Sequence, residues 1–321
     1  MSNTKANASH TMNLKEWALL ITLSILWGGS FFFNGVALKE IPVFTVVFGR
    51  VCIAAIALLI FLKIRGIPLP KSPSILLALL FMGFINNAIP FSLIVAGQTQ
   101  IGSGLAAILN ATTPLFTAVI VHLFTSDQSE RLTPRRIMGI AFGIAGVAIM
   151  IGPDIGAIGL NGPEVLGQLA ILGAAIAYGI ALTFGRRFAK AGISPMVIAA
   201  GQMTGASIFM LPLVIVIDNP LEFIGSVSLA SILAVAALAL LSTAVAYVLY
   251  FKILSSAGAT NASLVTLLVP VSAAILGILF LNETLDVESI AGMAFIGAGL
   301  LVMDGRILNL FKQKQPGKLP G

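Results

Sequence analysis

The sequence predicts an all-α polytopic membrane protein with ten transmembrane helices, arranged as two inverted five-helix repeats with both termini in the cytoplasm. Three observations lead to this fold class: a shortage of charge, ten long apolar runs and an internal repeat. Only 9% of the 321 residues are charged and 58% are hydrophobic, whereas a soluble domain carries about 25% charged residues. This supply cannot cover a water-exposed surface, so an ordinary soluble enzyme, a disordered chain and a coiled coil are excluded.

Ten runs approach the length of about 20 apolar residues that a helix needs to cross the hydrocarbon layer. They are apolar on all sides, which excludes transmembrane β-strands, because those alternate polar and apolar residues. The first run lacks a small-residue cleavage site, so we expect a retained helix and not a signal peptide. The runs cover residues 17–37, 44–62, 74–96, 103–124, 136–152, 166–185, 195–217, 229–251, 260–281 and 289–305.

Basic residues are divided unevenly between the connectors of these runs. Counted alternately from the N-terminal tail, one set of connectors holds every Lys and Arg except Lys39 and Arg50. Because Lys and Arg in short loops stay on the cytoplasmic side, this set and both termini are predicted to be cytoplasmic. The net charge of +6 is spread between apolar runs and is not gathered on one arm, so we expect a lipid bilayer and no nucleic acid as partner.

The fifth and tenth runs repeat each other, reading MGIAFGIAGVAIM and AGMAFIGAGLLVM. An odd number of spans per repeat makes the second copy enter the membrane from the opposite side. Such inverted repeats are typical of secondary transporters, whose two halves open one central site to each side in turn. We therefore expect a cytoplasmic tail at 1–16, a first repeat at 17–152, a second repeat at 166–305 and a cytoplasmic tail at 306–321.

Ionisable groups are scarce inside the runs, where they would be functional candidates by default. No Asp or Glu lies near the middle of any run, so we find no candidate carboxylate for coupling transport to protons or sodium. His122 is either a proton carrier or an interfacial histidine. Cys52 is the one cysteine, which excludes an intramolecular disulfide. With so few nucleophiles, bases and ligands we expect no enzyme, no catalytic residue, no metal and no cofactor.

Arg50 is the one cation within a run, about six residues from its outer end and thus roughly 9 Å deep. It either reaches the outer headgroups or caps neighbouring carbonyls, or it provides the counter-charge for an anionic group of a substrate.

Three prolines lie mid-span, and each removes the backbone hydrogen bond to the carbonyl four residues earlier. Pro90, Pro114 and Pro270 are thus candidates for helix breaks or gates, or are hinges satisfied within the bundle. Each freed carbonyl belongs to a polar residue: Asn86, Asn110 and Thr266.

Polar residues recur at matching depths in both repeats, which suggests a shared cavity wall. Asn86 and Asn87 correspond to Ser242 and Thr243, 156 residues later. Trp27 and Tyr178 occupy similar mid-membrane places in the first helix of each repeat, and line a cavity or pack in the core. Further candidates are Tyr247, Tyr250, Gln98 and Gln202.

The glycines of the fifth and tenth runs include Gly139 and Gly143 at a spacing typical of close helix packing. We expect these two helices to act as a scaffold around the other eight or as a homodimer face.

Several stretches together resemble one family. They are LWGGSFF in the first run, FGRVC around Arg50, GSGLAAILNATTPLF and its copy GATNASLVTLLVPVS, and ERLTPRRIMG with ETLDVESIAG. The chain resembles the drug/metabolite transporter superfamily in its ten-helix EamA branch, and is most similar to the YddG type of bacterial amino-acid exporter. This resemblance implies a basket-shaped bundle with a central substrate cavity and helices five and ten outside. The four-helix multidrug members carry a glutamate in their first helix, which this chain lacks.

These observations predict a carrier in the bacterial plasma membrane that exports amino acids or similar zwitterionic metabolites by alternating access. Without a membrane carboxylate, transport is expected to be facilitative. Efflux of drugs or other amphipaths is the alternative. A membrane enzyme or receptor is a third class, against which the inverted repeat argues.

Overall fold

The computed structural model describes residues 12–124 and 131–304, and within these ranges the regular structure is entirely helical. The expected C-terminal tail at 306–321, and most of the N-terminal tail at 1–16, lie outside the described residues. The described elements are α1 (Leu14–Ala37), α2 (Val43–Ile64), α3 (Pro73–Gly83), η1 (Phe84–Ala88), α4 (Ile89–Gly97), α5 (Ser103–Asn110), α6 (Thr113–Phe124), α7 (Pro134–Ile158), α8 (Pro163–Lys190), α9 (Pro195–Leu213), η3 (Val214–Asp218), η4 (Pro220–Glu222), α10 (Leu229–Ala239), η5 (Leu240–Val245), α11 (Ala246–Ala262), α12 (Val265–Leu281) and α13 (Val287–Asp304).

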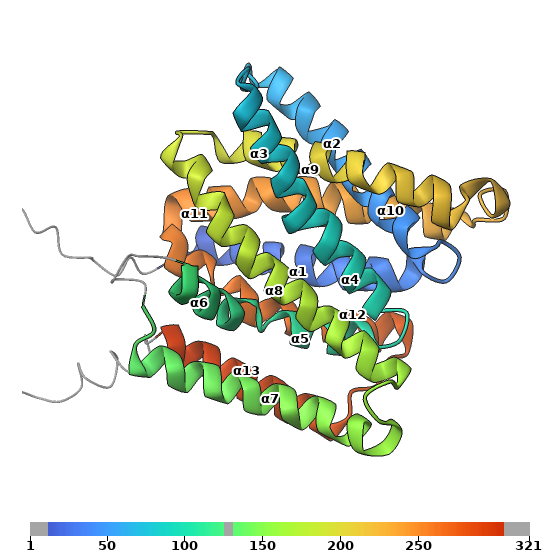
Figure 1. Cartoon of the computed structure of the whole chain (residues 1–321), viewed down its shortest axis with the longest axis vertical. Helices are drawn as coiled ribbons and strands as arrows, with labels where there is room; N and C mark the ends of the chain where they lie inside the picture. The colour runs from blue at the N-terminus through green and yellow to red at the C-terminus, as the bar shows by residue number, and fades with distance from the viewer. Residues whose placement is uncertain (1–11, 125–130, 305–321) are drawn as a thin grey trace, which may run out of the picture.

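The long helices run back and forth along one axis, so that their connectors gather at two ends of the bundle (Figure 1). Within the described chain, nine helical stretches are long and apolar enough to cross a membrane. The remaining apolar helix, Val265–Leu281, has 17 residues. It begins only at Val265, because the chain turns at Ser263 and Leu264. The preceding helix, α11, is kinked at Gly258, whose φ of 83° suits glycine. The count of ten spans stays a prediction.

Helix starts lie where local capping satisfies free backbone N–H groups. Asn13 and Glu16 form a capping box, in which each side chain accepts a 3.0 Å hydrogen bond from the other residue's N–H. This box starts α1 at Leu14, three residues before the expected start of the first run. Proline at the first position similarly starts α7, α8 and α9.

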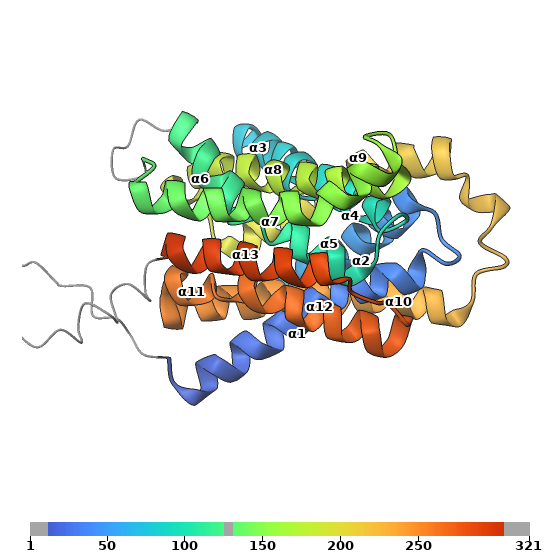
Figure 2. The same ribbon diagram turned by 90° about the horizontal axis from the view of Figure 1, so that it is seen from below.

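Helices α7 and α13 pack along one edge of the bundle (Figure 1) and lie side by side in the view from below (Figure 2). A Cβ atom built on Gly299 would lie 2.5 Å from the carbonyl oxygen of Gly139, and one on Gly146 would lie 2.8 Å from that of Gly292. The repeated glycines therefore let the two backbones touch within one chain. A homodimer through the outer faces of these helices stays a prediction.

We predict that Gly299→Ala costs roughly 1–3 kcal/mol of stability, because its methyl group has no room against the α7 backbone. Gly297→Ala on the same helix is the matched control, since nothing lies within 4 Å of its Cβ position. The control should be neutral or slightly stabilising, by up to about 1 kcal/mol, from its better helix propensity. Thermal unfolding in detergent measures both variants. Equal melting temperatures for the two would contradict this packing.

Candidate functional site

One group of buried polar side chains lies at and beside two π-helical segments, η1 and η5. A π-helical turn holds one extra residue and often marks a functional site. Asn86 and Asn87 lie on η1, and Ser242 and Thr243 lie on η5. The two polar pairs that match at an offset of 156 residues thus occupy the same kind of local distortion. Pro90 is the second residue after η1, whereas no proline lies in or next to η5.

Arg50, on α2, is 6% exposed and reaches across to η5. Its Nε donates to Oγ1 of Thr243 at 3.0 Å, and its guanidinium carbon lies 3.6 Å from the centroid of the Phe91 ring. Thr243 in turn donates to the carbonyl of Leu238 at 2.9 Å, so its hydroxyl is oriented to accept from Arg50. Within the described chain Arg50 has no carboxylate partner, and its two terminal nitrogens make no hydrogen bond.

A chain of side-chain hydrogen bonds runs beside Arg50. Asn86 Nδ2 donates to Gln202 Oε1 at 3.0 Å, and Gln202 Nε2 donates to the Tyr247 hydroxyl at 2.9 Å. The phenol groups of Tyr178 and Tyr247 lie within electrostatic range of the Arg50 charge. We call Arg50, Asn86, Asn87, Gln202, Thr243 and Tyr247 the central polar cluster.

Some candidate side chains are fully enclosed without a partner. Asn87 is 0% exposed, and neither atom of its amide makes a hydrogen bond among the described residues, although Tyr247 lies beside it. Ser242 Oγ and Asn110 Oδ1 are likewise buried and unpaired in the described chain. An unpaired buried polar group costs about 1–3 kcal/mol. Native proteins leave few such groups, so each of these calls for an explanation.

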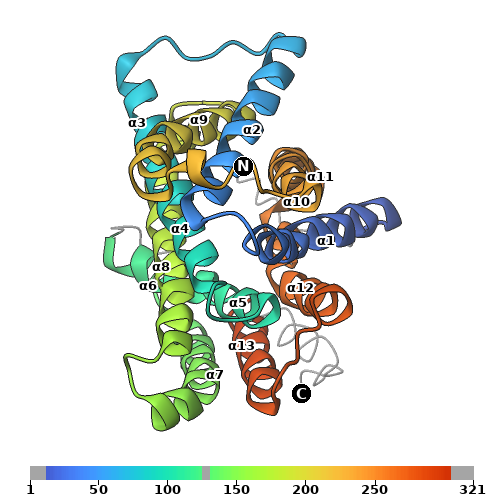
Figure 3. The ribbon, with the colours of Figure 1, turned by 90° about the vertical axis from the view of Figure 1, so that its right-hand side faces the viewer.

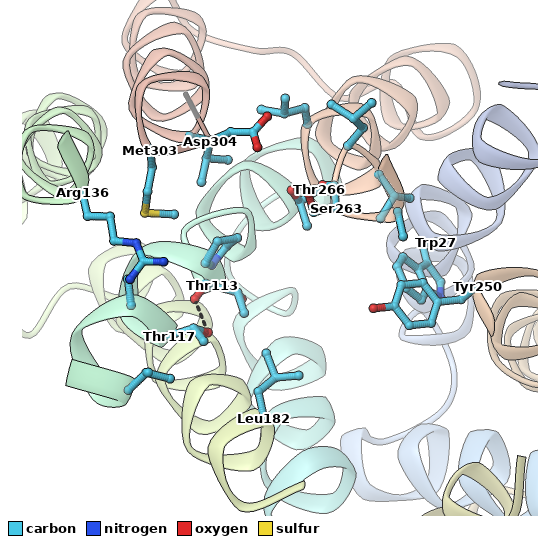
Figure 4. Close-up of a pocket in the computed structure, with 18 of the residues that line it drawn as sticks. Trp27, Thr113, Thr117, Arg136, Leu182, Tyr250, Ser263, Thr266, Met303 and Asp304 are labelled. Atoms are coloured by element: carbon cyan, nitrogen blue, oxygen red, sulfur yellow. Dashed lines mark hydrogen bonds between the residues drawn. The ribbon is translucent and has the colours of Figure 1, made fainter. Parts of the chain in front are cut away.

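A cavity of about 520 Å³ reaches Tyr250, three residues after Tyr247 of the central polar cluster, but is lined by none of the cluster residues. It extends from mid-span residues such as Trp27 and Thr113 to the bundle end where α7 starts and α13 ends (Figure 4). Both repeats line it. The first contributes Trp27, Thr113, Pro114, Thr117, Ala118, Val121 and Arg136, and the second contributes Leu182, Arg186, Tyr250, Ala262–Leu267, Leu300, Met303 and Asp304.

The inner wall of the cavity contains a pair of aromatic rings. The Trp27 and Tyr250 ring centroids are 5.4 Å apart, and Figure 4 shows the pair across the cavity from Arg136 and Met303. Tyr250 lines the cavity, and Tyr247 of the central polar cluster precedes it on α11 by nearly one helical turn. On α8, Tyr178 likewise precedes Leu182 of the cavity lining by about one turn. The central polar cluster therefore lies about one turn beyond this wall, towards the opposite end of the bundle.

The structure separates the sequence-predicted site residues into these two places. Trp27 and Pro114 lie on the cavity, while the expected cavity wall of Asn86, Asn87, Ser242, Thr243 and Tyr247 lies behind it in the protein interior, as does Arg50. Tyr178 packs against the apolar core on both sides. Ser242 faces α1, where its Oγ lies 4.0 Å from the Cβ position of Gly29.

The expected helix breaks differ between the repeats. At Pro114 the chain does break, because α5 ends at Asn110 and α6 begins at Thr113. At Pro270 the helix continues, and the interruption lies at Ser263 and Leu264, nearly two turns earlier. The lining of the cavity by residues 262–267 depends on this earlier break.

Phe91 is a site residue that the sequence reasoning missed. It is 5% exposed and lies under the Arg50 guanidinium, where a cation over an aromatic face is stabilised. Its one signal is its place next to Pro90 on the turn after Asn87. In the described residues no group of three or more His, Cys, Asp or Glu side chains is placed to hold a metal ion.

Comparisons with known proteins place this arrangement in a family. The model of the EamA-like transporter family matches the chain twice, at residues 15–152 and 165–303. A solved crystal structure of a protein shares the fold, with a TM-score of 0.63, 18% sequence identity, and coverage of 92% of this chain and 98% of that chain.

Several relatives match over nearly their whole length. The uncharacterized transporter YoaV of Bacillus subtilis is 25% identical over 88% of this chain and 94% of its own. The uncharacterized inner membrane transporter YedA of Escherichia coli is 28% identical over 92% of each chain. A third E. coli protein, named "Probable amino-acid metabolite efflux pump", is 27% identical over 94% of this chain and 96% of its own. With the family model matched over both stretches, the chain is a multi-pass membrane protein that belongs to the EamA-like transporter family, within the drug/metabolite transporter superfamily.

Proposed function

We propose that this protein is a secondary transporter of the YddG type, which exports amino acids across the bacterial plasma membrane by alternating access. Ten spans would form two inverted five-helix repeats with both termini in the cytoplasm. The double match of the family model supports the duplication. The inner-membrane relative and the amino-acid metabolite efflux relative support the location and the cargo.

The observation that carries the proposal is the buried Arg50 without a carboxylate partner in the described chain. An unpaired buried charge is costly unless a partner completes it. The carboxylate of an amino acid fits the two terminal nitrogens of the guanidinium, because both groups are planar and pair in a fork. The unpaired Oδ1 of Asn87 and the neighbouring phenol of Tyr247 would accept the ammonium group. A zwitterion would thus pair its carboxylate with Arg50 and its ammonium with neutral oxygen acceptors.

The cavity supplies the route to that cluster. Its open end is bordered by Arg136 and Arg186, which belong to the connectors expected in the cytoplasm. With this topology, the described conformation would be the inward-facing one. The cavity volume of about 520 Å³ lies within the range of small-molecule sites. In this proposal the Trp27 and Tyr250 pair on the cavity wall would act as the inner barrier, and a rotation of either ring would let cargo pass to the central polar cluster.

Efflux of amphipathic compounds is a second candidate, favoured by the apolar part of the cavity lining. Such cargo would meet an apolar surface, made by Trp27, Leu182, Leu264, Val265 and Leu300. Expression in a sensitive host distinguishes the two candidates. An amino-acid exporter should raise resistance to toxic amino-acid analogues, whereas an amphipath pump should raise resistance to lipophilic cations.

Replacing Arg50 tests the carboxylate site. Arg50→Gln should raise the KM for amino-acid transport in proteoliposomes by roughly 10- to 100-fold, the value of one or more charge-assisted hydrogen bonds. Arg50→Lys should lie between this variant and the wild type, since it keeps the charge and loses the planar fork. Arg65→Gln, on the same helix but exposed at its end, is the matched control. An unchanged KM in Arg50→Gln would remove Arg50 from the site.

The absence of a mid-span carboxylate among the described residues predicts facilitative transport. Proteoliposomes loaded with labelled amino acid should release it down its own gradient when pH and sodium are equal on both sides. Collapsing an imposed proton or sodium gradient should leave the initial rate unchanged within a factor of about two. A rate that depends on either gradient would defeat this prediction.

A further inference from the structure

Figure 3 faces the end of the bundle opposite the cavity. At this end three carboxylates, which the mechanism above does not use, join helices of the two repeats. Each carboxylate lies at the end of one helix and accepts hydrogen bonds from the first turn of another. In every case the donor helix belongs to the other repeat.

Glu283 follows α12 and binds the start of α5. Its Oε1 accepts from the N–H of Ser103 at 2.8 Å, and its Oε2 accepts from the N–H of Gly104 at 3.2 Å. A slot of two glycines admits this side chain. A Cβ on Gly102 would lie 3.1 Å from the Glu283 carboxyl carbon, and a Cβ on Gly277 would lie 2.3 Å from its Oε2. The backbone around Glu283 is therefore shaped for the carboxylate.

Asp218 and Glu40 make the same type of contact. Asp218 lies in the second repeat and accepts from the first, whereas Glu40 lies in the first repeat and accepts from the second. Asp218, at the end of η3, accepts from the N–H of Thr45 at 2.6 Å and from its hydroxyl at 2.8 Å, at the start of α2. Glu40 follows α1 and accepts from the N–H of Ser228 at 2.8 Å and from its hydroxyl at 2.6 Å, at the start of α10. The hydrogen bonds from Ser228 lower the pKa of the Glu40 carboxyl below its ordinary value, so that it stays ionised.

These contacts are strong yet reversible. The first turn of a helix carries a partial positive charge and free N–H groups, so a carboxylate placed there is doubly stabilised. Glu40 is exposed, and Asp218 and Glu283 are only partly buried, so water can take over each hydrogen bond when the helices separate. Contacts between packed apolar side chains have no such substitute.

Alternating access requires the two repeats to separate at this end when the cavity closes at the other. We propose that Glu40, Asp218 and Glu283 form the outer gate of the transporter, three carboxylate latches that hold the repeats together in the inward-facing state and release together. This gate rests on the proposed function. We call the three first turns at Thr45, Ser103 and Ser228 the latched turns.

Hydrogen exchange followed by mass spectrometry tests the gate without any cargo. Glu283→Gln replaces one acceptor oxygen with a donor and should open the latch. If the latches release together, exchange should rise about tenfold, the value of one charge-assisted hydrogen bond, at all three latched turns. Glu40→Gln, from the other repeat, should reproduce the pattern and guards against misfolding of one variant.

Glu288→Gln is the matched control, because Glu288 lies exposed at the same end and makes no side-chain hydrogen bond within the described chain. It should leave exchange at the latched turns at the wild-type rate. Faster exchange confined to the turn of Ser103 in Glu283→Gln would show three separate helix caps and overturn the gate. Unchanged exchange at every latched turn would overturn it as well.

A reversible cross-link tests the gate in transport. In a Cys52→Ser background, Glu40→Cys with Ser228→Cys is joined by a flexible bis-methanethiosulfonate reagent, and amino-acid efflux from proteoliposomes is measured. The joined protein should lose at least about nine-tenths of its flux and regain it on reduction, because the outer end cannot open. Full flux in the joined protein would overturn the gate. A wild-type protein that moves no amino acid would instead defeat the proposed function, and hydrogen exchange alone would then decide the gate.

Discussion

A polar group in the hydrocarbon core of a membrane has no water to bind, so it must find a partner in the protein or in a ligand. This constraint explains the apolar composition of the helices and the few polar residues that remain. One group of them lies at η1 and η5, where the helix is π-helical. Most of them pair with each other, as in the chain from Asn86 through Gln202 to Tyr247. Arg50 and Asn87 keep unused hydrogen-bonding capacity, and a cargo with two charges would complete them.

The two ends of the bundle satisfy the same constraint differently. At one end, the cavity brings solvent towards mid-span, between helices of both repeats. At the other, carboxylates replace solvent at helix N-termini, as Glu283 does for Ser103 and Gly104. Between the ends lies the central polar cluster, and Trp27 and Tyr250 line the cavity at mid-span. Such an arrangement suits a molecule that opens one end at a time.

Much of the fold could be predicted from the sequence, because the bilayer demands long apolar runs and these are visible without tertiary information. The start of α1 at Leu14 could also have been found from the Asn13 and Glu16 capping box. The separation of the site residues into the cavity and the central polar cluster could not have been predicted. Pro90 signals a loosened helix at η1, but η5 contains no proline and its π-turns depend on packing. Arg50 has two partners that are distant in the sequence: Thr243, 193 residues later, and Phe91, on α4. No local sequence pattern therefore identifies them.

The central claim is that a buried cation without a carboxylate partner in the described chain selects a cargo that carries its own balancing charges. Counterflow in proteoliposomes tests it most directly, with a panel of the twenty amino acids alongside their amides, their decarboxylated amines and lipophilic cations. The claim predicts that neutral amino acids exchange with internal labelled amino acid, whereas amides and amines of the same side chain do not. Exchange that is supported equally by the amines, or only by lipophilic cations, would contradict it.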